Sequence, residues 1–297
     1  MDMKHDEMAK ALEATGDYRV LRRRPPFQPL PVAGETTTLA MVIDVETTGL
    51  DTDRAEIIEL GIVPFRYTAE RIVEVLPAFS RFNEPASPIT EEISRITGIT
   101  KEMVAGHRID PRQVAEVVDP CSFVIAHNAG FDRRVAERHF PALAAKPWAC
   151  SVEEIGWKEA GFASARLGAI AGAFGFFFDA HRAADDCLTL IEILSRPMPR
   201  DAEGRTVFSL LRAAARRPTT RLLAASTPFD AKDLLKARGY RWEAGQGGRP
   251  KGWFRDLTDD VTEEETGWLA EAVYTGRPDV HRYALDAWSR YSEREWA

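Results

Sequence analysis

Hydrophobic residues fall into short runs that predict strands and periodic stretches that predict helices. Three apolar runs follow one another at residues 39–45, 56–65 and 72–82, joined by short polar turns. Short connections favour antiparallel pairing, so these runs predict a three-stranded meander. Another apolar run, at residues 122–128, predicts a further buried strand.

Helical spacing of apolar residues begins after the meander. Helices are expected at residues 112–118, 131–140, 166–176 and 183–195, and Thr90 is placed to cap another. A meander followed by alternating helices and strands indicates an α/β domain with a mixed sheet.

Composition divides the chain into three parts. Residues 1–36 form an N-terminal arm, whose prolines favour extended chain. The α/β pattern occupies residues 37–200. Between Arg212 and Arg255 there are eleven Lys and Arg against three Asp and Glu, and an acidic stretch follows. We therefore expect a small α+β accessory domain, basic and aromatic, over residues 203–297.

Charge and composition limit the classes of function. A net charge of −7 argues against a protein that coats nucleic acid, but it allows an enzyme that binds nucleic acid locally. Three arginines at 22–24 suit a solvated linker or a phosphate contact. No apolar run reaches the roughly 18 residues of a membrane span, and the three scattered cysteines indicate no disulfide framework. We expect a cytoplasmic protein with no membrane partner.

Acidic residues stand at the end of the first predicted strand. Asp44 and Glu46 lie two residues apart, so both side chains project from one face of the sheet. Burying two like charges is costly unless a cation pairs with them, and oxygen ligands suit Mg²⁺ or Mn²⁺. A strand end with solvated acids is the alternative.

A further acid lies one turn into the helix that follows the strand at 122–128. This residue, Asp132, also suits the dipole at a helix N-terminus. His127 and Asn128 close the strand before it and can be ordinary polar residues of a strand end.

The segment "HRAADD" holds one histidine and two adjacent aspartates. A helical wheel puts Asp186 at the edge of the apolar face. It puts Asp185 on the opposite, solvated side with Thr189 and Glu192. His181 can join Asp186 only from a loop that precedes the helix.

These motifs together resemble those of the DEDDh exonuclease superfamily, most closely its DNA polymerase III epsilon-like, or proofreading, branch. The matching elements are Asp44-x-Glu46, "HNAGFD" ending at Asp132, and His181 with Asp186 five residues later. Their order and spacing agree over about residues 38–196, and "RAEIIELG" and "ITGIT" are also similar. The resemblance implies an RNase H-like fold, with a mixed five-stranded sheet flanked by helices.

The resemblance also implies an activity. The protein would be a 3′–5′ exonuclease that releases nucleoside 5′-monophosphates from nucleic-acid 3′ ends, with DNA expected and single strands preferred. Two divalent ions, Mg²⁺ or Mn²⁺, would flank the scissile phosphate. Asp44, Glu46 and Asp186 would hold the first ion; Asp44 would also touch the second, which Asp132 would support. His181 would be the general base, because imidazole titrates near neutral pH.

Substrate contacts follow from the same resemblance. Thr47, Gly49 and Leu50 would line the terminal nucleotide, and Ile96 and Thr97 would lie near its base. Many relatives have histidine where Thr97 stands. The phosphate or sugar would be approached by His127, Asn128 and Phe131. Core packing is the alternative for Ile96 and Phe131.

The accessory domain interleaves aromatic and basic residues. A helix at 230–237 ends at Gly239, and two strands follow around a glycine-rich turn. The interleaved residues are Tyr240, Arg241, Trp242, Lys251, Trp253, Phe254 and Arg255. They suit stacking on single-stranded bases with neutralisation of phosphates, or a small core built from the tryptophans. The acidic tail, with Trp268, Trp288 and Trp296, suggests a helical cap or a partner surface.

Other functions stay open beside the exonuclease hypothesis. An exonuclease that acts on RNA has the same motifs. A catalytically silent nucleic-acid-binding protein is a second alternative, against which the intact acids and histidine argue. A proofreading subunit held by a polymerase is a third, but no clamp-binding segment such as Q-x-x-L-x-F is present. A stand-alone repair or turnover enzyme is preferred, with a polymerase or repair protein as the candidate partner.

Overall fold

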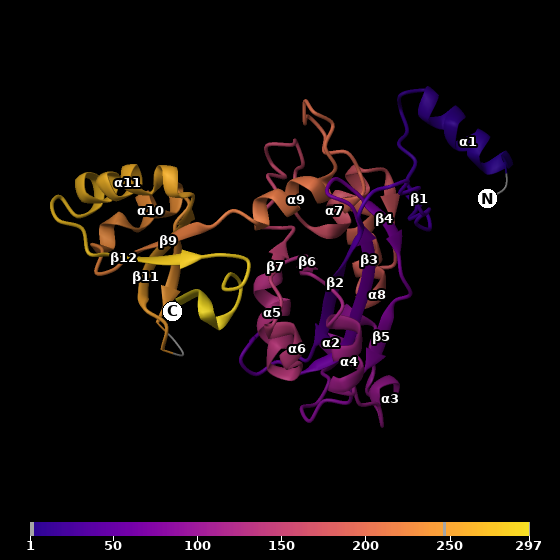
Figure 1. Ribbon diagram of the computed structural model, residues 1–297, viewed down its shortest axis with the longest axis horizontal. Coiled ribbons are helices and arrows are strands. Elements are labelled where there is room, and N and C mark those ends of the chain that lie inside the picture. Colours follow the sequence, from indigo (N-terminus) through magenta and orange to yellow (C-terminus); the bar gives the residue numbers. More distant parts are fainter. Residues whose placement is uncertain (1–2, 246–247, 297) are drawn as a thin grey trace.

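The computed structural model describes residues 3–245 and 248–296, which form two lobes with the N-terminal arm alongside the larger one (Figure 1). The larger lobe is built on a mixed sheet of order β4-β3-β2-β6-β7, with β5 also paired to β3. Its strands are β2 (Thr38–Thr47), β3 (Ile57–Tyr67), β4 (Ile72–Val75), β5 (Phe79–Phe82), β6 (Val124–Ala126) and β7 (Trp148–Cys150).

The pairing confirms the predicted mixed sheet. β2, β3 and β4 form the antiparallel meander, and β6 and β7 add parallel strands beside β2. The single strand predicted at 72–82 is two strands, β4 and β5, which pair with successive parts of β3. The interruption includes Pro77, which has no N–H to donate. Because β4 and β5 share one position beside β3, the sheet is five strands wide.

Helices cover both faces of this sheet. They are α2 (Glu91–Thr97), α3 (Lys101–Val104), α4 (Pro111–Val118), α5 (Ala129–His139), α6 (Pro141–Ala144), α7 (Leu167–Ala173), α8 (Ala183–Leu194) and α9 (Val207–Ala215). Ala40 and Val42 pack with residues of α7, α8 and α9 on one face. Met41 and Ile43 pack with α4, α5 and α6 on the other. The alternation therefore places Asp44 and Glu46 on the face that α8 covers.

The N-terminal arm is docked on the larger lobe rather than being a solvated linker. It contains α1 (Met3–Ala14) and the two-residue strand β1 (Arg22–Arg23), which pairs in parallel with β8 (Phe176–Phe177). The three consecutive arginines pair, in order, with Glu13, Asp179 and Asp185. The expectation of a solvated linker is therefore wrong, and a phosphate contact for these arginines stays a prediction.

The C-terminal lobe is a second, four-stranded sheet of order β10-β11-β9-β12. Its elements are β9 (Thr219–Ala224), η1 (Phe229–Ala231), α10 (Lys232–Ala237), β10 (Arg241–Ala244), β11 (Lys251–Leu257), α11 (Asp259–Trp268), η3 (Leu269–Val273), β12 (Val280–Leu285) and η4 (Glu293–Trp296). Gly239 follows α10 at a φ of 87°, as predicted for a glycine at a helix end. Residues 246–247 of the predicted turn lie outside the described residues.

Contacts between the lobes do not match a domain boundary at residue 203. Helix α9 lies beyond that point, yet Phe208 packs into the core of the larger lobe. The chain after β12 also returns to that lobe: the buried guanidinium of Arg133 donates to the carbonyls of Ala287, Trp288 and Arg290. The packing favours a boundary after α9, and separate domains stay a prediction.

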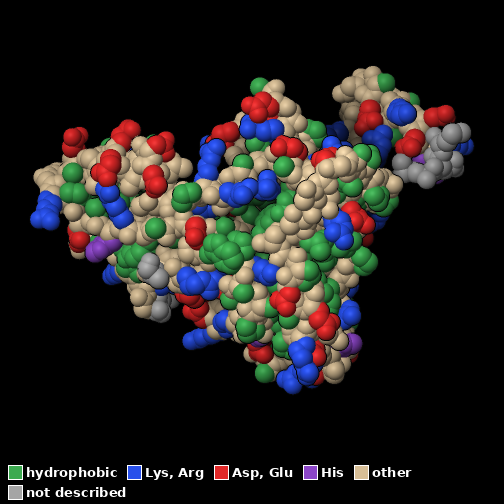
Figure 2. All heavy atoms as spheres, viewed as in Figure 1, with side chains coloured by type: hydrophobic (Ala, Val, Ile, Leu, Met, Phe, Trp, Pro, Cys, Tyr) green, Lys and Arg blue, Asp and Glu red, His purple; other side chains and the backbone are tan. Residues whose placement is uncertain are grey.

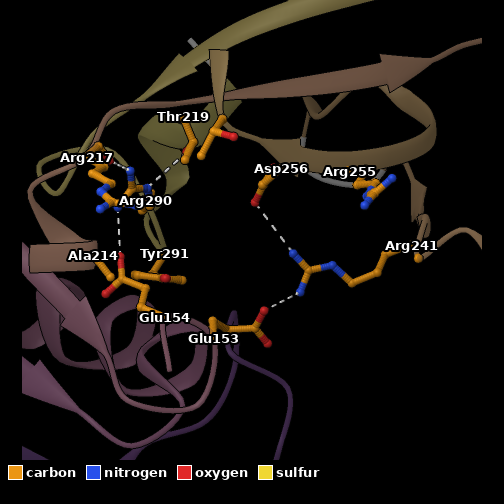
Figure 3. Close-up of a pocket in the computed structure, with 12 residues that line it drawn as sticks. Glu153, Glu154, Ala214, Arg217, Thr219, Arg241, Arg255, Asp256, Arg290 and Tyr291 are labelled. Carbon is orange, nitrogen blue, oxygen red and sulfur yellow. Dashed lines mark hydrogen bonds and ion pairs between the residues drawn. The ribbon is translucent and has the colours of Figure 1, made fainter. Parts of the chain in front are cut away.

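Between the lobes lies a cleft of about 590 Å³. Ion pairs brace it: Arg241 contacts both Glu153 and Asp256, and Arg290 contacts Glu154 (Figure 3). On the face in Figure 2, Lys and Arg gather along the junction of the lobes and acids along the upper edge of the smaller one. Within residues 3–245 and 248–296, no helix is both long and apolar enough to cross a membrane.

Candidate active site

Three carboxylates from two elements meet at one end of the sheet. Asp44 and Glu46 project from the C-terminal end of β2, and Asp186 projects from the first turn of α8. Each offers one oxygen to a group whose oxygens all lie within 4.8 Å of one another. Two oxygens on opposite sides of a Mg²⁺ ion lie about 4.2 Å apart, because each Mg–O bond is about 2.1 Å long. The three residues, referred to below as the acid cluster, therefore fit a small cation with oxygen ligands.

Asp132 lies close to the acid cluster but is not one of its three residues. It is buried in the first turn of α5, and its carboxylate accepts a hydrogen bond from the Val45 N–H at 3.1 Å. This bond fastens the start of α5 to the strand that carries Asp44 and Glu46. The fourth acid is therefore positioned by the same strand as the first two.

Burial raises the pKa of all four acids, and repulsion among them adds to the rise for Asp44, Glu46 and Asp132. Desolvation is the largest cause for each, and repulsion by Asp132 comes next for Asp44. The pKa of Glu46 rises to about 8, through burial and then the charge of Asp186. A divalent cation would offset these like charges.

We expect the metal-free protein to lose stability as the pH rises. Folding raises the pKa of Glu46 from about 4.5 to about 8, so between these values the folded state binds more protons than the unfolded state. The free energy of unfolding in EDTA should therefore fall from about pH 5 to about pH 8, and saturating Mg²⁺ or Mn²⁺ should oppose the fall. Thermal melts with and without metal measure both effects. Equal stability at the two pH values in EDTA would contradict a partly buried cluster of repelling acids.

His181 stands on a short loop before α8, as the motif spacing requires. It is exposed, and its backbone has a φ of 67°, which is uncommon for a residue other than glycine. The N–H of Arg182 donates to the Asp186 carboxylate at 3.1 Å and closes the loop. Burial raises the pKa of Asp186, and this N–H and the nearby His181 act against that rise. His181 therefore lies within electrostatic reach of the acid cluster.

Asp185 faces away from the cluster. Its side chain is 43% exposed and pairs with Arg24 of the arm at 3.3 Å, so the predicted separation of the two aspartates is confirmed. The expectation that Thr189 and Glu192 share a solvated side is wrong, because both are buried. Helices α7 and α9 contact α8, so burial extends around most of that helix.

Glu59, for which no role was predicted, is a fifth acid at this site. It lies opposite Glu46 in the β2–β3 pair and is buried. Its carboxylate accepts hydrogen bonds from the Arg182 guanidinium and the Ala183 N–H, both at 3.3 Å. These bonds fasten the start of α8 to β3. The available signal was a glutamate inside the apolar run "IIELGIV", since a buried acid requires partners.

Several predicted substrate contacts are open to solvent. Leu50 is 88% and Ile96 50% exposed, and Asn128 is exposed as well. Apart from Gly49 itself and its two chain neighbours, no described residue has an atom within 4 Å of a Cβ placed on Gly49. Phe131 is partly buried against the core, so core packing describes Phe131 and not Ile96.

Two predicted contacts are threonines whose hydroxyls are bonded inside the fold. The Thr47 hydroxyl donates to the Gly49 carbonyl at 2.7 Å and closes the turn after β2. The Thr97 hydroxyl donates to the Ile93 carbonyl at 2.9 Å and accepts from the Ile99 N–H at 3.1 Å. These bonds give both hydroxyls a structural role, and their contact with a nucleotide stays a prediction.

Both ring nitrogens of His127 are also engaged. Nδ1 lies 2.7 Å from the Ser151 hydroxyl, and Nε2 lies 2.8 Å from the Ala165 carbonyl. Because that carbonyl can only accept, Nε2 carries the proton. Burial lowers the pKa of His127 to about 4, so the ring is neutral at physiological pH. In this conformation His127 therefore has no free ring nitrogen for the predicted contact with a phosphate or sugar.

Residues 41–194 match the RNase_T exonuclease family model. A PolC-type DNA polymerase III from Thermotoga maritima is 35% identical over 96 residues, which cover 32% of this chain and 7% of that protein. The PolC-type polymerase of Clostridium perfringens is 28% identical over 162 residues, covering 52% of this chain and 11% of that protein. The chain thus matches only a small part of the length of these relatives.

Solved structures of nucleases overlap with the chain in part. Escherichia coli Exonuclease I in complex with a dA16 oligonucleotide gives a TM-score of 0.49 at 13% identity, over 78% of this chain and 68% of that one. Exonuclease X in complex with 5′ overhanging duplex DNA gives 0.45 at 23% identity, over 59% and 99%. The family match covers more than half of the chain and includes all four acids and His181. The chain therefore belongs to the exonuclease family that this model describes.

Proposed function

We propose that this enzyme removes nucleoside 5′-monophosphates from the 3′ ends of DNA, preferring single strands, by two-metal hydrolysis. The observation that carries the proposal is the acid cluster, whose three oxygens lie within 4.8 Å of one another. Mg²⁺ or Mn²⁺ bound there would activate the attacking water and stabilise the leaving 3′-oxygen.

Each acid has a distinct part in this proposal. Asp44, Glu46 and Asp186 would hold one ion, and Asp44 with Asp132 would hold the second. Asp132 accepts the Val45 N–H, which fixes the direction of its carboxylate. The burial that raises the pKa values of these groups also makes a cation the natural partner of their ionised forms.

His181 would take the proton of the attacking water. Its ring makes no hydrogen bond or ion pair within the described part of the chain, and the side chain is exposed. His127, by contrast, has both nitrogens bonded. Glu59 would act as a positioning residue, because its bonds to Arg182 and Ala183 hold the start of α8 beside the cluster.

The choice of DNA rests on relatives rather than on a contact. The two relatives named above are DNA polymerases, which favours DNA over RNA as the substrate. A polymerase or repair protein is the corresponding partner, and a cytoplasmic location is part of the same proposal.

A digestion panel tests the activity. Single-stranded DNA, duplex DNA and RNA, each labelled at the 5′ end, are incubated with Mg²⁺ or Mn²⁺. We expect a ladder that shortens from the 3′ end, fastest on single-stranded DNA, with nucleoside 5′-monophosphates as the product. Faster loss of RNA would favour the RNA-directed alternative. If none of the substrates were cut with either metal, a silent nucleic-acid-binding protein would replace the proposal.

A further inference from the structure

A groove of about 760 Å³ lies on the C-terminal lobe, which does not carry the acid cluster. The loop at 225–228, the start of α10 and the β10–β11 strands form its walls. Six of its lining residues are aromatic or cationic: Phe229, Lys232, Lys236, Trp242, Lys251 and Trp253. We refer to it as the lysine–aromatic groove.

Two of the aromatic rings in this groove are exposed to solvent. Phe229 is 80% and Trp242 is 49% exposed, while Tyr240 and Trp253 are buried in the core of the same lobe. The interleaved aromatic residues of this lobe therefore have two roles. The buried rings build the small core, and the exposed rings offer flat apolar surfaces to a ligand.

The three lysines of the groove have no carboxylate partner among the described residues. In residues 3–245 and 248–296, none of the ion pairs within 4.0 Å includes Lys232, Lys236 or Lys251. Instead the Lys232 ammonium lies 5.0 Å from the Phe229 ring centroid, and the Lys251 ammonium lies 5.9 Å from the Trp242 centroid. None of the described residues that line the groove is an aspartate or a glutamate.

The cleft between the lobes differs in this respect. Its Arg241 and Arg290 are held by Glu153, Asp256 and Glu154 (Figure 3). Much of its positive charge is therefore neutralised within the protein. The lysine–aromatic groove keeps its positive charge for a ligand, and that ligand has to combine anionic groups with flat apolar surfaces.

We propose that the lysine–aromatic groove binds single-stranded nucleic acid as a site additional to the acid cluster. Bases would stack on Phe229 and Trp242, and the lysines would neutralise the phosphates between them. A base inside a duplex has both faces covered, so the exposed rings select single strands. The choice of DNA as the strand rests on the proposed function.

Binding is measured by fluorescence anisotropy of a 5′-labelled oligo(dT) in EDTA, where metal-dependent cleavage is blocked. We expect Trp242→Ala to weaken binding roughly 5- to 100-fold, which corresponds to one stacked base. Phe229→Ser tests the second ring at a position outside the core, so it separates lost stacking from lost folding. Trp288→Ala is the matched control, because Trp288 is 53% exposed and lines a different cavity.

The lysines are tested through salt dependence. For Lys232→Gln/Lys236→Gln, we expect the slope of log affinity against log salt to fall by about 1.4, because each single-strand phosphate that is no longer neutralised lowers it by about 0.7. Lys10→Gln/Lys158→Gln removes the same charge at exposed positions elsewhere and should leave the slope unchanged. Unchanged affinity in Trp242→Ala and Phe229→Ser, or equal slopes in the two lysine variants, would overturn the proposal, as would a wild-type protein that does not bind oligo(dT).

Cleavage separates this proposal from the function on which it rests. A trinucleotide that occupies only the acid cluster should be cut equally by wild type and Trp242→Ala, whereas a long single strand should show a raised KM in the variant. If wild type and variant cut both substrates equally, the exonuclease function would be supported and the binding role of the groove would be contradicted. Binding to oligo(dT) in EDTA, without cleavage of either substrate in the presence of metal, would support the groove and contradict the exonuclease function.

Discussion

Asp44→Asn should slow cleavage strongly and at the same time stabilise the metal-free protein. The loss of activity follows because the carboxylate is one of three that fit the cation; metal coordination contributes several kcal/mol of transition-state stabilisation, so a fall of about 10³-fold is expected. The gain in stability follows because asparagine removes a charge that burial and repulsion by Asp132 make unfavourable. Single-turnover cleavage rates and thermal melts in EDTA measure the two effects.

Adjacent aspartates supply the control for this prediction. Asp186→Asn should resemble Asp44→Asn, because Asp186 belongs to the acid cluster. Asp185→Asn should stay within a few-fold of wild type, because Asp185 pairs with Arg24 outside the cluster. Near wild-type cleavage by Asp186→Asn would refute the assignment of the cluster. A lower melting temperature for Asp44→Asn in EDTA would show that its carboxylate has a structural role.

The strand period predicted the geometry at the end of β2 correctly. Because alternate residues share a face, Asp44 and Glu46 had to project together, and α8 covers that face. The position of His181 did not follow from periodicity, since a helical wheel applies only within a helix. It required the spacing of a known motif, and the structure places the residue on the expected loop.

Where sequence reasoning failed, the cause was tertiary packing. The wheel for α8 assumed one solvated side, but α7 and α9 also contact this helix, so Thr189 is buried. Arg24 has the sequence context of a linker residue. Its ion pair with Asp185 joins residues that are distant in sequence, so it could not be predicted from local composition. Composition likewise could not show which tryptophans are exposed and which are buried. The exposure of Trp242 and the burial of Trp253 depend on which strand lies at the edge of the second sheet.

Gly61→Ala should disrupt the candidate active site through packing alone. Gly61 lies opposite Asp44 in the β2–β3 pair, and a Cβ placed on it would lie 2.5 Å from the Ala183 backbone carbon and 2.7 Å from the Ala184 nitrogen. These atoms belong to the first turn of α8, so no side-chain rotation can relieve the overlap. The helix has to move away from the sheet, and Asp186 and the His181 loop move with it.

The expected effects of Gly61→Ala are large for one methyl group. Overpacking of this kind costs about 2–3 kcal/mol, which lowers the melting temperature by roughly 5–10 °C in a chain of this size. Displacing Asp186 by about 1 Å should slow cleavage about 10²-fold. Mg²⁺ should also stabilise the variant less than it stabilises wild type, because the three oxygens no longer converge.

Gly168→Ala separates close approach from the general cost of replacing glycine. Gly168 lies in α7, and outside the adjacent part of that helix no described residue has an atom within 4 Å of the added Cβ. Alanine should therefore stabilise the helix by up to about 1 kcal/mol and leave cleavage unchanged. Wild-type stability and cleavage in Gly61→Ala would show that α8 does not rest on Gly61. A loss of stability with unchanged metal binding and cleavage would show that the contact supports the fold without positioning Asp186. Only a joint loss of stability, metal response and rate supports α8 as the element that brings Asp186 to the strand carrying Asp44 and Glu46.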